Sequence, residues 1–575
     1  MSLFPEMHSA HTATVIALRE QFGSSPSSIL DVLTELKSAE GKLSREVVRE
    51  VARAYGVPAE RVAGMASFYS LLSTGGTRDR TLRICDGVAC WMKGADGILS
   101  RCESLASDST EMTVTRNSCL GLCDKAPAAL LGERQFGPMP VKLESLEQLL
   151  ASKLPEPKRL PPERPHETRF VMRRATEFFR KLPESDGFPP ADYRHILRMI
   201  EAGPSEIFAL LESADLHGLG GAGYPTSRKW RQTAALSAEV KYVICNADES
   251  EPLSIKDRTL IDIDPHRLLE GMLLAGFAVG ARRGIIYIRG EYEPQARKLE
   301  QAIEQARSAG WLGQPIDGSG FSFKIHVHRG AGAYICGEET ALLESLEGKR
   351  GEPRPRPPYP VELGLSGAPT IVNNVETLAM TAAICEYGID EFRAIHTEHA
   401  VGTKLYGLFG HVQHPGLFEA PRGLKLGELL ERYGGLSDAA DFSFALIGGA
   451  AGTFADRSRW NHRLDFAHNE TTIPMGTGAV LVCNSSVSVP AVLRQLLHFF
   501  EVESCGKCTP CRVGTSEARQ LLDQLLAGQG TTADLARFEA LSRTLKLSLC
   551  GLGTSVPIPI ASALRHFRNQ FEALI

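Results

Sequence analysis

The segment VKYVICNADESEPLSIKDRTLIDIDPHRLLEGMLLAGFAVGARRGIIYIRG, residues 240–290, decides the fold that we expect at the centre of this chain. It opens with a short apolar strand, VKYVICN, continues through a long apolar helix, PHRLLEGMLLAGFAVGA, and closes with a second strand, GIIYIRG. A further helix, QARKLEQAIEQAR, and a third strand, FKIHVHRG from Phe323, continue the alternation. Strands that alternate with helices indicate right-handed βαβ units and a largely parallel sheet.

A polar or glycine-rich loop follows each of these strands: NADESEP, RGEYEP and RGAGAYICGEE. Ligands of parallel sheets bind at the carboxyl ends of the strands, so a binding site is expected among these loops. Taken singly, acidic runs of this kind are more often solvated surface. The loop HGLGGAGYPTSRKW adds a G-x-G-x-x-G pattern at Gly218, Gly220 and Gly223, whose bare backbone could approach a phosphate or a flat ring. That pattern alone is weak, because no clear strand precedes it and packing glycines are common.

The regions on either side have other patterns. Residues 28–62 predict two amphipathic helices, the second closed by Gly56 and Pro58, and short strands at 82–85 and 112–115 each run into a pair of cysteines. The proline-rich stretch LPEPKRLPPERPHE, residues 154–167, predicts a semi-rigid extended linker. Short strands around a helix at 425–433 indicate a small α+β module, and the chain from about residue 489 is predicted to be helical.

Composition narrows the class of protein. The 575 residues are 43% apolar, enough for three to five domains of roughly 100–200 residues. A net charge of -5 gives no basic footprint for nucleic acid. The chain starts without a basic and then apolar leader, and its longest apolar segment, 268–281, is far too short for a bilayer. We therefore expect a cytoplasmic protein without membrane insertion. Its thirteen cysteines then favour metal or redox chemistry over disulfides.

The stretch SCGKCTPCRVG places three thiols in one tight loop, at Cys505, Cys508 and Cys511. Cys550, in the glycine-rich loop LCGLG, is the natural fourth ligand. Three cysteines spaced two residues apart, with a distant fourth, favour a cubane [4Fe–4S] cluster, whereas zinc generally prefers two separated pairs.

The other set consists of two pairs, Cys85 with Cys90 and Cys119 with Cys123. Each pair can hold one iron of a [2Fe–2S] centre, but two pairs also make a tetrahedral zinc site, so both interpretations stay open on spacing alone. The remaining cysteines stand singly in mostly apolar surroundings and are expected to be buried small residues: Cys102, Cys245, Cys336, Cys385 and Cys483.

Five motifs in series carry a resemblance: HGLGGAGYPTSRKW, NADESEP, GAGAYICGEETALLESLEG, PTIVNNVETL and SCGKCTPCRVGT. In this order they closely resemble the flavin- and NADH-binding subunit of respiratory complex I and its relatives. Residues 1–150 resemble the smaller complex I subunit, a helical bundle plus a thioredoxin-like domain with a [2Fe–2S] cluster. The resemblance covers nearly the whole chain and favours iron–sulfur clusters at both cysteine sets.

The resemblance implies a multidomain α/β and α+β protein. The expected order is an N-terminal helical bundle (1–78), a thioredoxin-like [2Fe–2S] domain (79–152), a proline-rich linker (153–167), a Rossmann-like α/β domain for FMN and NAD(H) (168–400), a β-grasp-like module (401–485) and a helical [4Fe–4S] domain (486–575).

The same resemblance implies binding residues where the motifs match. For FMN these are Gly218, Gly220, Lys229, Asn246, Asp248, Tyr334, Gly337, Glu338, Asn373 and Asn374. For NAD(H) they are Tyr224, Glu251, Glu339, Arg356 and Tyr359, with aromatic rings stacking on adenine and carboxylates accepting ribose hydroxyls. The family often has Arg in place of Leu219 and Phe in place of Tyr224 and Tyr359.

The implied activity is that of a diaphorase. Nicotinamide exchanges a hydride and the clusters accept single electrons, so FMN is the converter and no side chain is required as a general acid or base. The regions that resemble the two complex I subunits are joined in one chain, as in the diaphorase subunit of cytoplasmic NAD-reducing [NiFe] hydrogenases, which this chain therefore resembles. That resemblance implies an iron–sulfur subunit and [NiFe] subunits as partners. The hydrogen chemistry would belong to those partners, since this chain lacks nickel ligands. The alternatives are the equivalent subunit of an NAD-dependent formate dehydrogenase or of complex I, and, in another class, a zinc-stapled scaffold without flavin.

Overall fold

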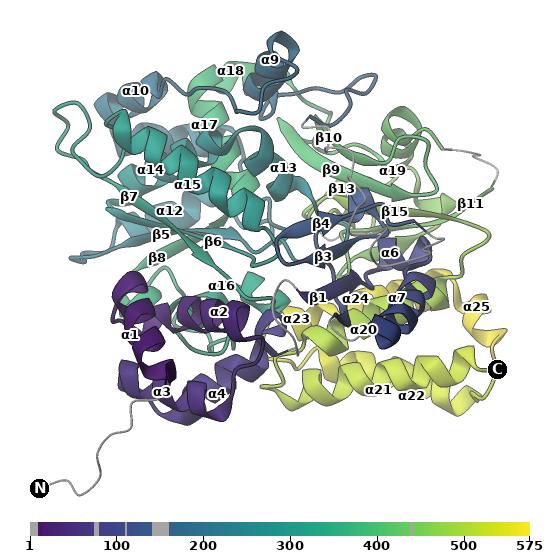
Figure 1. Ribbon diagram of the computed structural model, residues 1–575. Coiled ribbons are helices and arrows are strands. Elements are labelled where there is room, and N and C mark those ends of the chain that lie inside the picture. Colours follow the sequence, from purple (N-terminus) through teal and green to yellow (C-terminus); the bar gives the residue numbers. More distant parts are fainter. Residues whose placement is uncertain (1–9, 74–79, 110–111, 141–159, 437–440, 468) are drawn as a thin grey trace, which may run out of the picture.

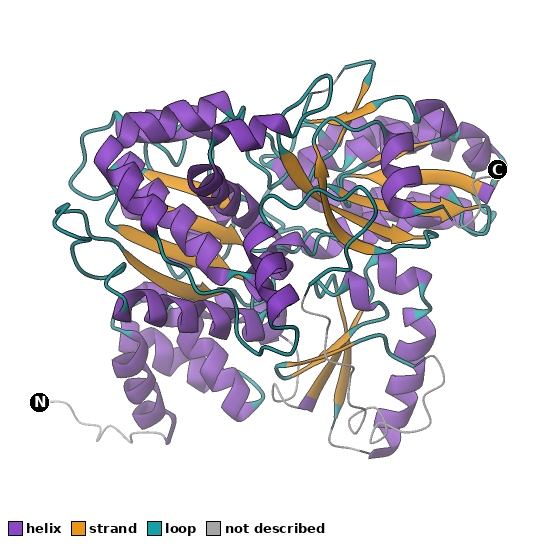
Figure 2. Ribbon diagram, turned by 90° about the horizontal axis from the view of Figure 1, so that it is seen from above, coloured by secondary structure: helices purple, strands orange, loops and turns teal. Residues whose placement is uncertain are grey.

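A computed structural model describes residues 10–73, 80–109, 112–140, 160–436, 441–467 and 469–575 of the chain (Figure 1). In Figure 1 the first and last helical regions, purple and yellow, occupy the lower part of the view, with the α/β domain and the green module above them. Figure 2 shows the strands in separate groups that are joined through helices and loops. Across the described residues, no helix combines the length and the apolar character that a membrane crossing requires.

The central sheet confirms the predicted parallel arrangement. Its strand order is β7-β6-β5-β8, and all three pairings are parallel. The strands are β5 (Tyr242–Ala247), β6 (Arg283–Ile288), β7 (Lys324–Arg329) and β8 (Thr370–Asn374). The predicted crossover helices are α14 (Pro265–Val279) and α15 (Glu293–Ser308). The sheet therefore brings the loops after its strands to one edge, as expected for a binding site.

The packing of α14 explains why most of its residues are apolar. Fourteen of its fifteen residues are buried, because the helix lies between the sheet and α17 (Val375–Tyr387). At the crossing, a Cβ on Gly271 would overlap the carbonyl of Leu378, so the two helices approach as closely as a glycine allows. The other helices of this domain are α9 (Arg173–Lys181), α10 (Arg194–Ala202), α11 (Pro204–Ser213), α12 (Thr226–Ala234), α13 (Lys256–Ile263), α16 (Glu339–Leu346) and α18 (Ile389–Ala394).

The N-terminal region is a helical bundle, as predicted. The two helices seen in the sequence pattern are α2 (Ile29–Glu40) and α3 (Arg45–Tyr55), and Gly56 closes the second in a left-handed conformation (φ 63°). Sequence patterns did not predict the remaining helices, α1 (Ala10–Phe22), α4 (Ala59–Phe68) and α5 (Ser70–Ser73).

The thioredoxin-like domain has the strand order β2-β1-β3-β4. The two predicted strands are β1 (Thr81–Cys85) and β2 (Thr113–Asn117), which pair in parallel. The strands β3 (Ala129–Leu131) and β4 (Arg134–Phe136) and the helices α6 (Val88–Met92) and α7 (Ala95–Ser109) complete it. Because β1 ends at Cys85 and β2 ends just before Cys119, the pairing brings the two cysteine loops to the same edge.

The predicted linker is docked over its described part. Arg164 is buried, donates to the carbonyls of Tyr433 (2.7 Å) and Gly416 (2.9 Å), and lies over the ring of Phe418 (4.3 Å). Residues 154–159 of the proline-rich stretch lie outside the described residues. From residue 160 onward the segment is therefore anchored on the module of residues 401–485, because Arg164 donates to backbone carbonyls of that module.

That module is built on a mixed five-stranded sheet of order β10-β9-β15-β11-β12. Its strands are β9 (Thr403–Gly410), β10 (Gly416–Pro421), β11 (Phe442–Ile447), β12 (Thr453–Ala455) and β15 (Ala479–Asn484), with a separate pair, β13 (Arg463–Asp465) and β14 (Thr472–Pro474). The predicted helix at 425–433 is present as α19 (Leu426–Glu428) followed by a wider π-helical turn at Leu429–Gly434.

The C-terminal region is helical, as predicted. Its helices are α20 (Val489–Glu503), α21 (Thr509–Leu526), α22 (Thr532–Leu545), α23 (Gly551–Ser555), α24 (Pro557–His566) and α25 (Arg568–Glu572). The three-cysteine loop connects α20 to α21, and Cys550 immediately precedes α23. All thirteen cysteines are free, and the five single ones are buried as expected.

Candidate functional site

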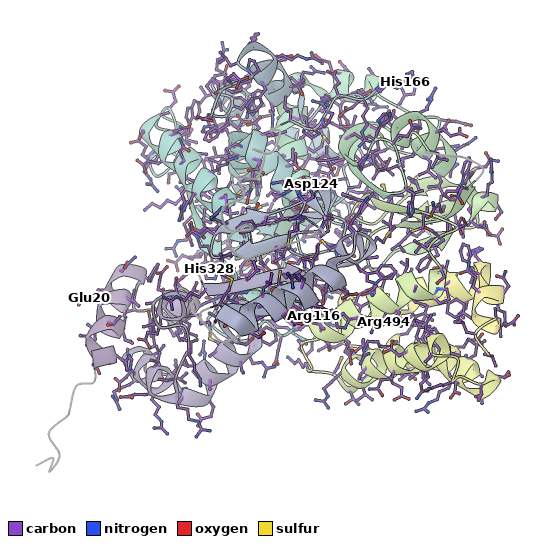
Figure 3. All side chains as sticks on the ribbon, turned by 45° about the vertical axis from the view of Figure 1, so that its right-hand side comes forward. Glu20, Arg116, Asp124, His166, His328 and Arg494 are labelled. Atoms are coloured by element: carbon purple, nitrogen blue, oxygen red, sulfur yellow. The ribbon has the colours of Figure 1, made fainter. Side chains whose placement is uncertain are left out.

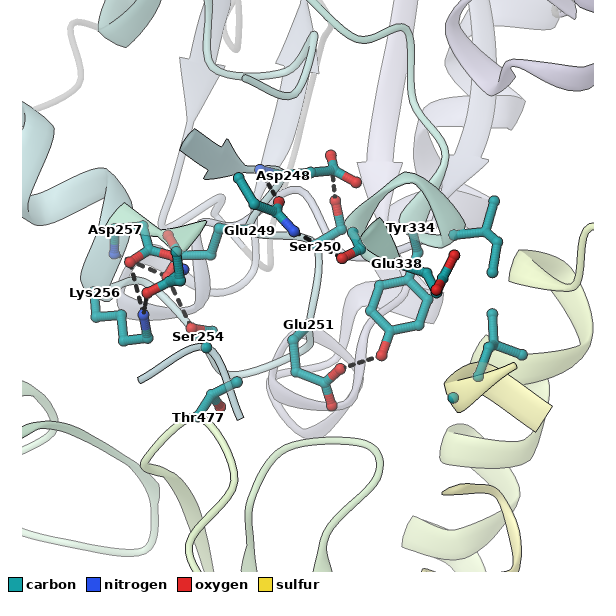
Figure 4. A pocket seen from close by; sticks show the side chains of 17 residues that line it. Asp248, Glu249, Ser250, Glu251, Ser254, Lys256, Asp257, Tyr334, Glu338 and Thr477 are labelled. Atoms are coloured by element: carbon teal, nitrogen blue, oxygen red, sulfur yellow. Dashed lines mark hydrogen bonds and ion pairs between the residues drawn. The ribbon is translucent and has the colours of Figure 1, made fainter. Parts of the chain in front are cut away.

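A cavity of about 240 Å³ lies beyond the carboxyl end of β5 (Figure 4). Its walls come from the glycine loop, the loop after β5, the turn at Tyr334–Gly337, the end of β8, the five-stranded module and the start of α23. Eight of the residues expected at the nucleotide sites line it: Gly220, Asn246, Asp248, Glu251, Tyr334, Gly337, Glu338 and Asn374. The structure thus brings together motifs that are up to 154 residues apart in the chain.

The loop after β5 presents its polar groups to this cavity. Asn246 donates through Nδ2 to the carbonyl of Gly337 (2.7 Å) and accepts from the N–H of Asp248 (3.1 Å). Asp248 Oδ1 accepts from Ser250 (3.2 Å), whereas its Oδ2 is buried and has no hydrogen-bond partner among the described residues. Burial raises the pKa of Asp248 well above its usual range. An unsatisfied buried oxygen that faces a polar cavity is available to a ligand hydroxyl or to a water molecule.

Glu251 and Tyr334 meet across the same cavity. The Tyr334 hydroxyl donates to a carboxylate oxygen of Glu251, and the other oxygen accepts from the N–H of Ala451 in the five-stranded module (3.2 Å). Figure 4 shows the Tyr334 hydroxyl pointing toward the carboxylate of Glu251, which belongs to the loop after β5. Burial raises the pKa of Glu251. The module therefore helps to form the cavity wall and is not a separate appendage.

The glycine loop lies over the end of β8. A Cβ on Gly220 would lie 2.9 Å from the Cβ of Asn374, so a side chain there would displace a cavity residue. Leu219 is buried, its N–H donates to Thr377 (2.9 Å), and its carbonyl accepts from Lys404 (3.2 Å). Burial lowers the pKa of Lys404 to about 8. The positive charge near this loop is thus supplied from β9 rather than from position 219.

Other expected residues lie outside the cavity wall. Lys229 pairs with Glu339 (3.0 Å), and Arg356 pairs with the same carboxylate (3.2 Å). Tyr224 and Tyr359 are exposed, at 43% and 51%, and the guanidinium of Arg228 lies 6.0 Å from the centre of the Tyr224 ring. Gly218 and Asn373 do not line the cavity either, and Asn373 accepts from the indole of Trp230 (2.9 Å).

The cavity also contains residues that sequence reasoning missed. Lys256 donates to Asp257 and to Asn374, both at 2.7 Å. Burial opposes its charge, but Asp257 and Glu376 outweigh burial and raise the pKa of Lys256. A lone lysine inside the acidic stretch NADESEPLSIKDR was a usable signal for it. The other missed lining residues are Glu249, Ser250, Ser254, Asp257, Ile335, Thr477, Gly551 and Leu552, of which the last three come from distant domains.

The residues present fit a bound flavin nucleotide. Glycines at positions 220 and 337 open the wall, Ile335 and Leu552 offer apolar surface, and Lys256 supplies a cation. Polar groups on Asp248, Asn246 and Asn374 match a hydroxyl-rich chain. The residues expected for NAD(H) at Tyr224, Tyr359 and the ion pairs around Glu339 lie outside this wall.

The four cysteines of the C-terminal set lie together, next to the cavity. Ser504 Oγ lies 3.3 Å from Cys511 Sγ, and a Cβ on Gly553 would lie 3.0 Å from the Cβ of Cys511, so α23 presses against the three-cysteine loop. Burial raises the pKa of Cys511 and of Cys550 to about 11, so these thiols need a metal to become thiolates. Leu552, two residues after Cys550, lines the cavity.

The other four cysteines are all buried and face one another. The Sγ atoms of Cys119 and Cys123 are 3.7 Å apart, and hydrogen bonding to the thiols of Cys119 and then Cys90 raises the pKa of Cys85. Four buried thiols in mutual contact can bind either a [2Fe–2S] cluster or a single zinc ion.

Four family models match the chain. The Nuo51 FMN-binding domain matches residues 211–383, and the iron–sulfur binding region of NADH-ubiquinone oxidoreductase-F matches 491–574. A thioredoxin-like [2Fe–2S] ferredoxin model matches 15–153, and an SLBB domain matches 406–451. FMN, a [4Fe–4S] cluster and a [2Fe–2S] cluster are therefore the cofactors of this architecture, and the small module that we expected to be β-grasp-like matches the SLBB model.

Known proteins resemble the chain over different spans. The F 2 subunit of NADH-quinone oxidoreductase from Rhizobium meliloti is 42% identical over 67% of this chain and 92% of that protein. The HndC subunit of the NADP-reducing hydrogenase from Solidesulfovibrio fructosivorans is 42% identical over 66% of this chain and 78% of that protein. A crystal structure of an air-oxidised NAD+-reducing [NiFe]-hydrogenase contains a chain of TM-score 0.84 and 32% identity, matched over 96% of this chain and 94% of that chain.

These likenesses agree with the geometry of the cavity and of both cysteine sets. The chain belongs to the family of NADH-quinone oxidoreductase F-type flavoproteins, oxidoreductases that use NAD(H), FMN and iron–sulfur clusters.

Proposed function

We propose that this chain is the diaphorase subunit of a cytoplasmic NAD-reducing [NiFe] hydrogenase, for the overall reaction H₂ + NAD⁺ = NADH + H⁺. The observation that carries the proposal is the extent of the likeness. The Rhizobium relative aligns with only 67% of this chain, whereas the chain in the solved hydrogenase aligns with 96%, including the bundle and the thioredoxin-like domain. Hydrogen chemistry would belong to partner subunits, and electrons would reach this chain through an iron–sulfur subunit.

The cavity residues would hold FMN. Asn246, Asp248 and Asn374 would bind its hydroxyl-bearing chain, Lys256 would balance its charge, and the bare backbone at Gly220 and Gly337 would admit its ring. Tyr334 and Glu338 would complete the wall around the flavin, and the other flavin residues expected from the motifs would support it from behind: Gly218, Lys229 and Asn373. The bound flavin supplies the exchange between a hydride and two single electrons.

NAD(H) would bind at the mouth of the cavity. Tyr224 and Tyr359 would stack on its adenine, while Glu251 and Glu339 would accept from ribose hydroxyls and Arg356 would hold the pyrophosphate side in place. The side chains orient the nicotinamide toward the flavin and take no part in proton transfer. Binding of the dinucleotide would then exclude water from the cavity.

The partner surface is expected where the C-terminal cysteines approach solvent. Four apolar side chains flank their loops and are strongly exposed: Val502 (56%), Val513 (52%), Leu547 (76%) and Leu549 (39%). Cys505 and Cys508 are themselves only half-buried. Exposed apolar groups around a redox centre favour a protein partner that shields it, here the iron–sulfur subunit that exchanges single electrons.

The flavin and cluster chemistry is tested on the purified chain. It should contain FMN and about six irons, and anaerobic NADH should bleach the flavin and produce a paramagnetic iron signal. It should also reduce ferricyanide with NADH. Protein that holds FMN and iron yet gives neither bleaching nor ferricyanide reduction would refute the nucleotide site, and a colourless zinc protein would support the scaffold alternative.

The electron donor is tested on the complex that the chain forms in its source cells. Complex isolated through this chain should reduce NAD⁺ with H₂ and contain nickel. Formate-dependent or quinone-dependent activity without nickel would instead assign the chain to a formate dehydrogenase or to complex I, which the 42% identity to the Rhizobium protein favours as the second candidate.

A further inference from the structure

The end of α20 contacts every redox region of the molecule. Its last residue, Glu503, stands two positions before Cys505 and thus begins the three-cysteine loop. One carboxylate oxygen of Glu503 accepts from the hydroxyl of Ser118, the neighbour of Cys119. The other accepts from the backbone N–H of Tyr334 at 2.9 Å, and Tyr334 lines the cavity. One side chain therefore joins three segments that are separated by more than 160 residues each.

The preceding turn of α20 also contacts the cavity and the thioredoxin-like domain. Phe499 packs edge-on against the ring of Tyr334, with ring centres 4.9 Å apart. His498 contacts the carboxylate of Asp86 at 3.2 Å, and Asp86 follows Cys85. The two cysteine loops of the thioredoxin-like domain are thus both attached to α20, through separate side chains. Glu503 is the shared element, because its contacts involve all three regions.

We propose that Glu503 is a positioning residue that holds the [2Fe–2S] loop, the flavin cavity and the [4Fe–4S] loop at set separations. The inference rests on the proposed electron transfer through these centres. Electron tunnelling falls steeply with separation, so a small shift of one loop changes the rate without any change in the reacting groups. A carboxylate suits the task because its two oxygens accept independently from two different segments.

Replacing Glu503 by glutamine and by alanine distinguishes the effect of its two hydrogen bonds from the effect of its charge. In Glu503→Gln the amide oxygen can still accept from Tyr334 N–H, and the amide nitrogen can donate to the Ser118 hydroxyl, which is both donor and acceptor. In Glu503→Ala both contacts are lost and the two segments are released. Glu501→Ala is the matched control, since Glu501 lies on the same turn but pairs with Arg519 of α21, away from the cavity.

The experiment compares the parent, Glu503→Ala, Glu503→Gln and Glu501→Ala as purified holoproteins. In Glu503→Ala we expect normal FMN content and a rate of flavin bleaching by NADH within about twofold of the parent, because Glu503 does not line the cavity. The electron paramagnetic resonance spectrum of the dithionite-reduced [2Fe–2S] centre should change, and reduction of the iron centres by NADH should slow by about tenfold or more. Glu503→Gln should restore the spectrum and most of the rate, and Glu501→Ala should match the parent.

A second variant covers the case in which Glu503→Ala loses iron or does not fold. Ser118→Ala removes only the contact to the thioredoxin-like domain, so the [2Fe–2S] spectrum should change while the [4Fe–4S] spectrum stays as in the parent. Spectra and iron-reduction rates of Glu503→Ala, or of Ser118→Ala in its place, that equal those of the parent would overturn the proposal. If the parent itself shows no flavin bleaching, the proposed function fails, but the dithionite-reduced spectra still decide the role of Glu503.

Discussion

Glu339 lies between two cations at the mouth of the cavity, paired with Lys229 and Arg356. Because its side chain is 24% exposed, its ion pairs should add less than about 1 kcal/mol to the free energy of unfolding. If it binds a ribose hydroxyl, Glu339→Gln should raise the KM for NADH by about tenfold, the loss expected for one charge-assisted hydrogen bond. NADH-ferricyanide kinetics and thermal unfolding check this.

The control for this substitution is Glu300→Gln. Glu300 pairs with Arg329 on β7, away from the cavity, and should leave the KM unchanged. Equal KM values for Glu339→Gln and the parent would argue against the proposed NAD(H) contact.

His195, on α10, is buried and its Nε2 has no hydrogen-bond partner among the described residues. Burial lowers the pKa of His195 to about 3. Below pH 6.5 the unfolded chain binds a proton that the folded chain refuses, so stability falls as the pH drops. Between pH 6.5 and 5 this residue alone should cost about 2 kcal/mol. Urea unfolding of the parent and of His195→Phe should show a shallower acid slope in the variant, and identical slopes would contradict the assignment.

At the scale of elements, α14 and α17 approach as closely as their backbones allow. A methyl group on Gly271 would overlap the Leu378 carbonyl, so Gly271→Ala should destabilise the protein by about 3 kcal/mol through overpacking. Gly97, inside α7, has open space around the same position. Gly97→Ala should therefore stabilise by about 0.5–1 kcal/mol, because alanine favours the helix. Thermal unfolding of the two variants should give shifts of opposite sign, and a loss of stability in both would refute the distinction.

At the scale of the whole molecule, the thioredoxin-like domain is joined to the α/β domain by Arg258, which is buried and pairs with Asp124 at 2.6 Å. Asp124→Ala should cost about 2–3 kcal/mol, because it leaves a buried guanidinium without its ion pair. Asp96→Ala in the same domain removes an exposed pair with Arg116 and should cost less than about 1 kcal/mol. Figure 3 labels Asp124 and Arg116.

Thermal unfolding of these two variants, at equal iron content, measures the difference. A similar small effect for both would mean that the contact through Arg258 does not hold the domains together. The expected result is a large shift for Asp124→Ala only.

Local patterns were sufficient for much of this architecture. The alternation of apolar strands and helices predicted β5, β6 and β7 in parallel, because such segments bury both faces of a sheet. The cysteine spacings predicted two metal-binding sites. The glycine pattern at 218–223 predicted a backbone that could approach a phosphate or a flat ring, and that stays a prediction. The short strands β3 and β4 and the helices α1 and α4 were missed, since three-residue strands and weakly periodic helices carry little signal.

The sequence by itself determined which residue types are available for redox chemistry: the thiols at fixed spacing, the glycines at 218–223 and the carboxylates after β5. Only the tertiary structure decided which of them share a space. Lys404 reaches the glycine loop from another sheet, Leu552 enters the cavity from α23, and Glu503 meets Ser118 across 385 residues. Contacts of this kind depend on how separate layers pack, and no local pattern of hydrophobicity or spacing encodes that packing.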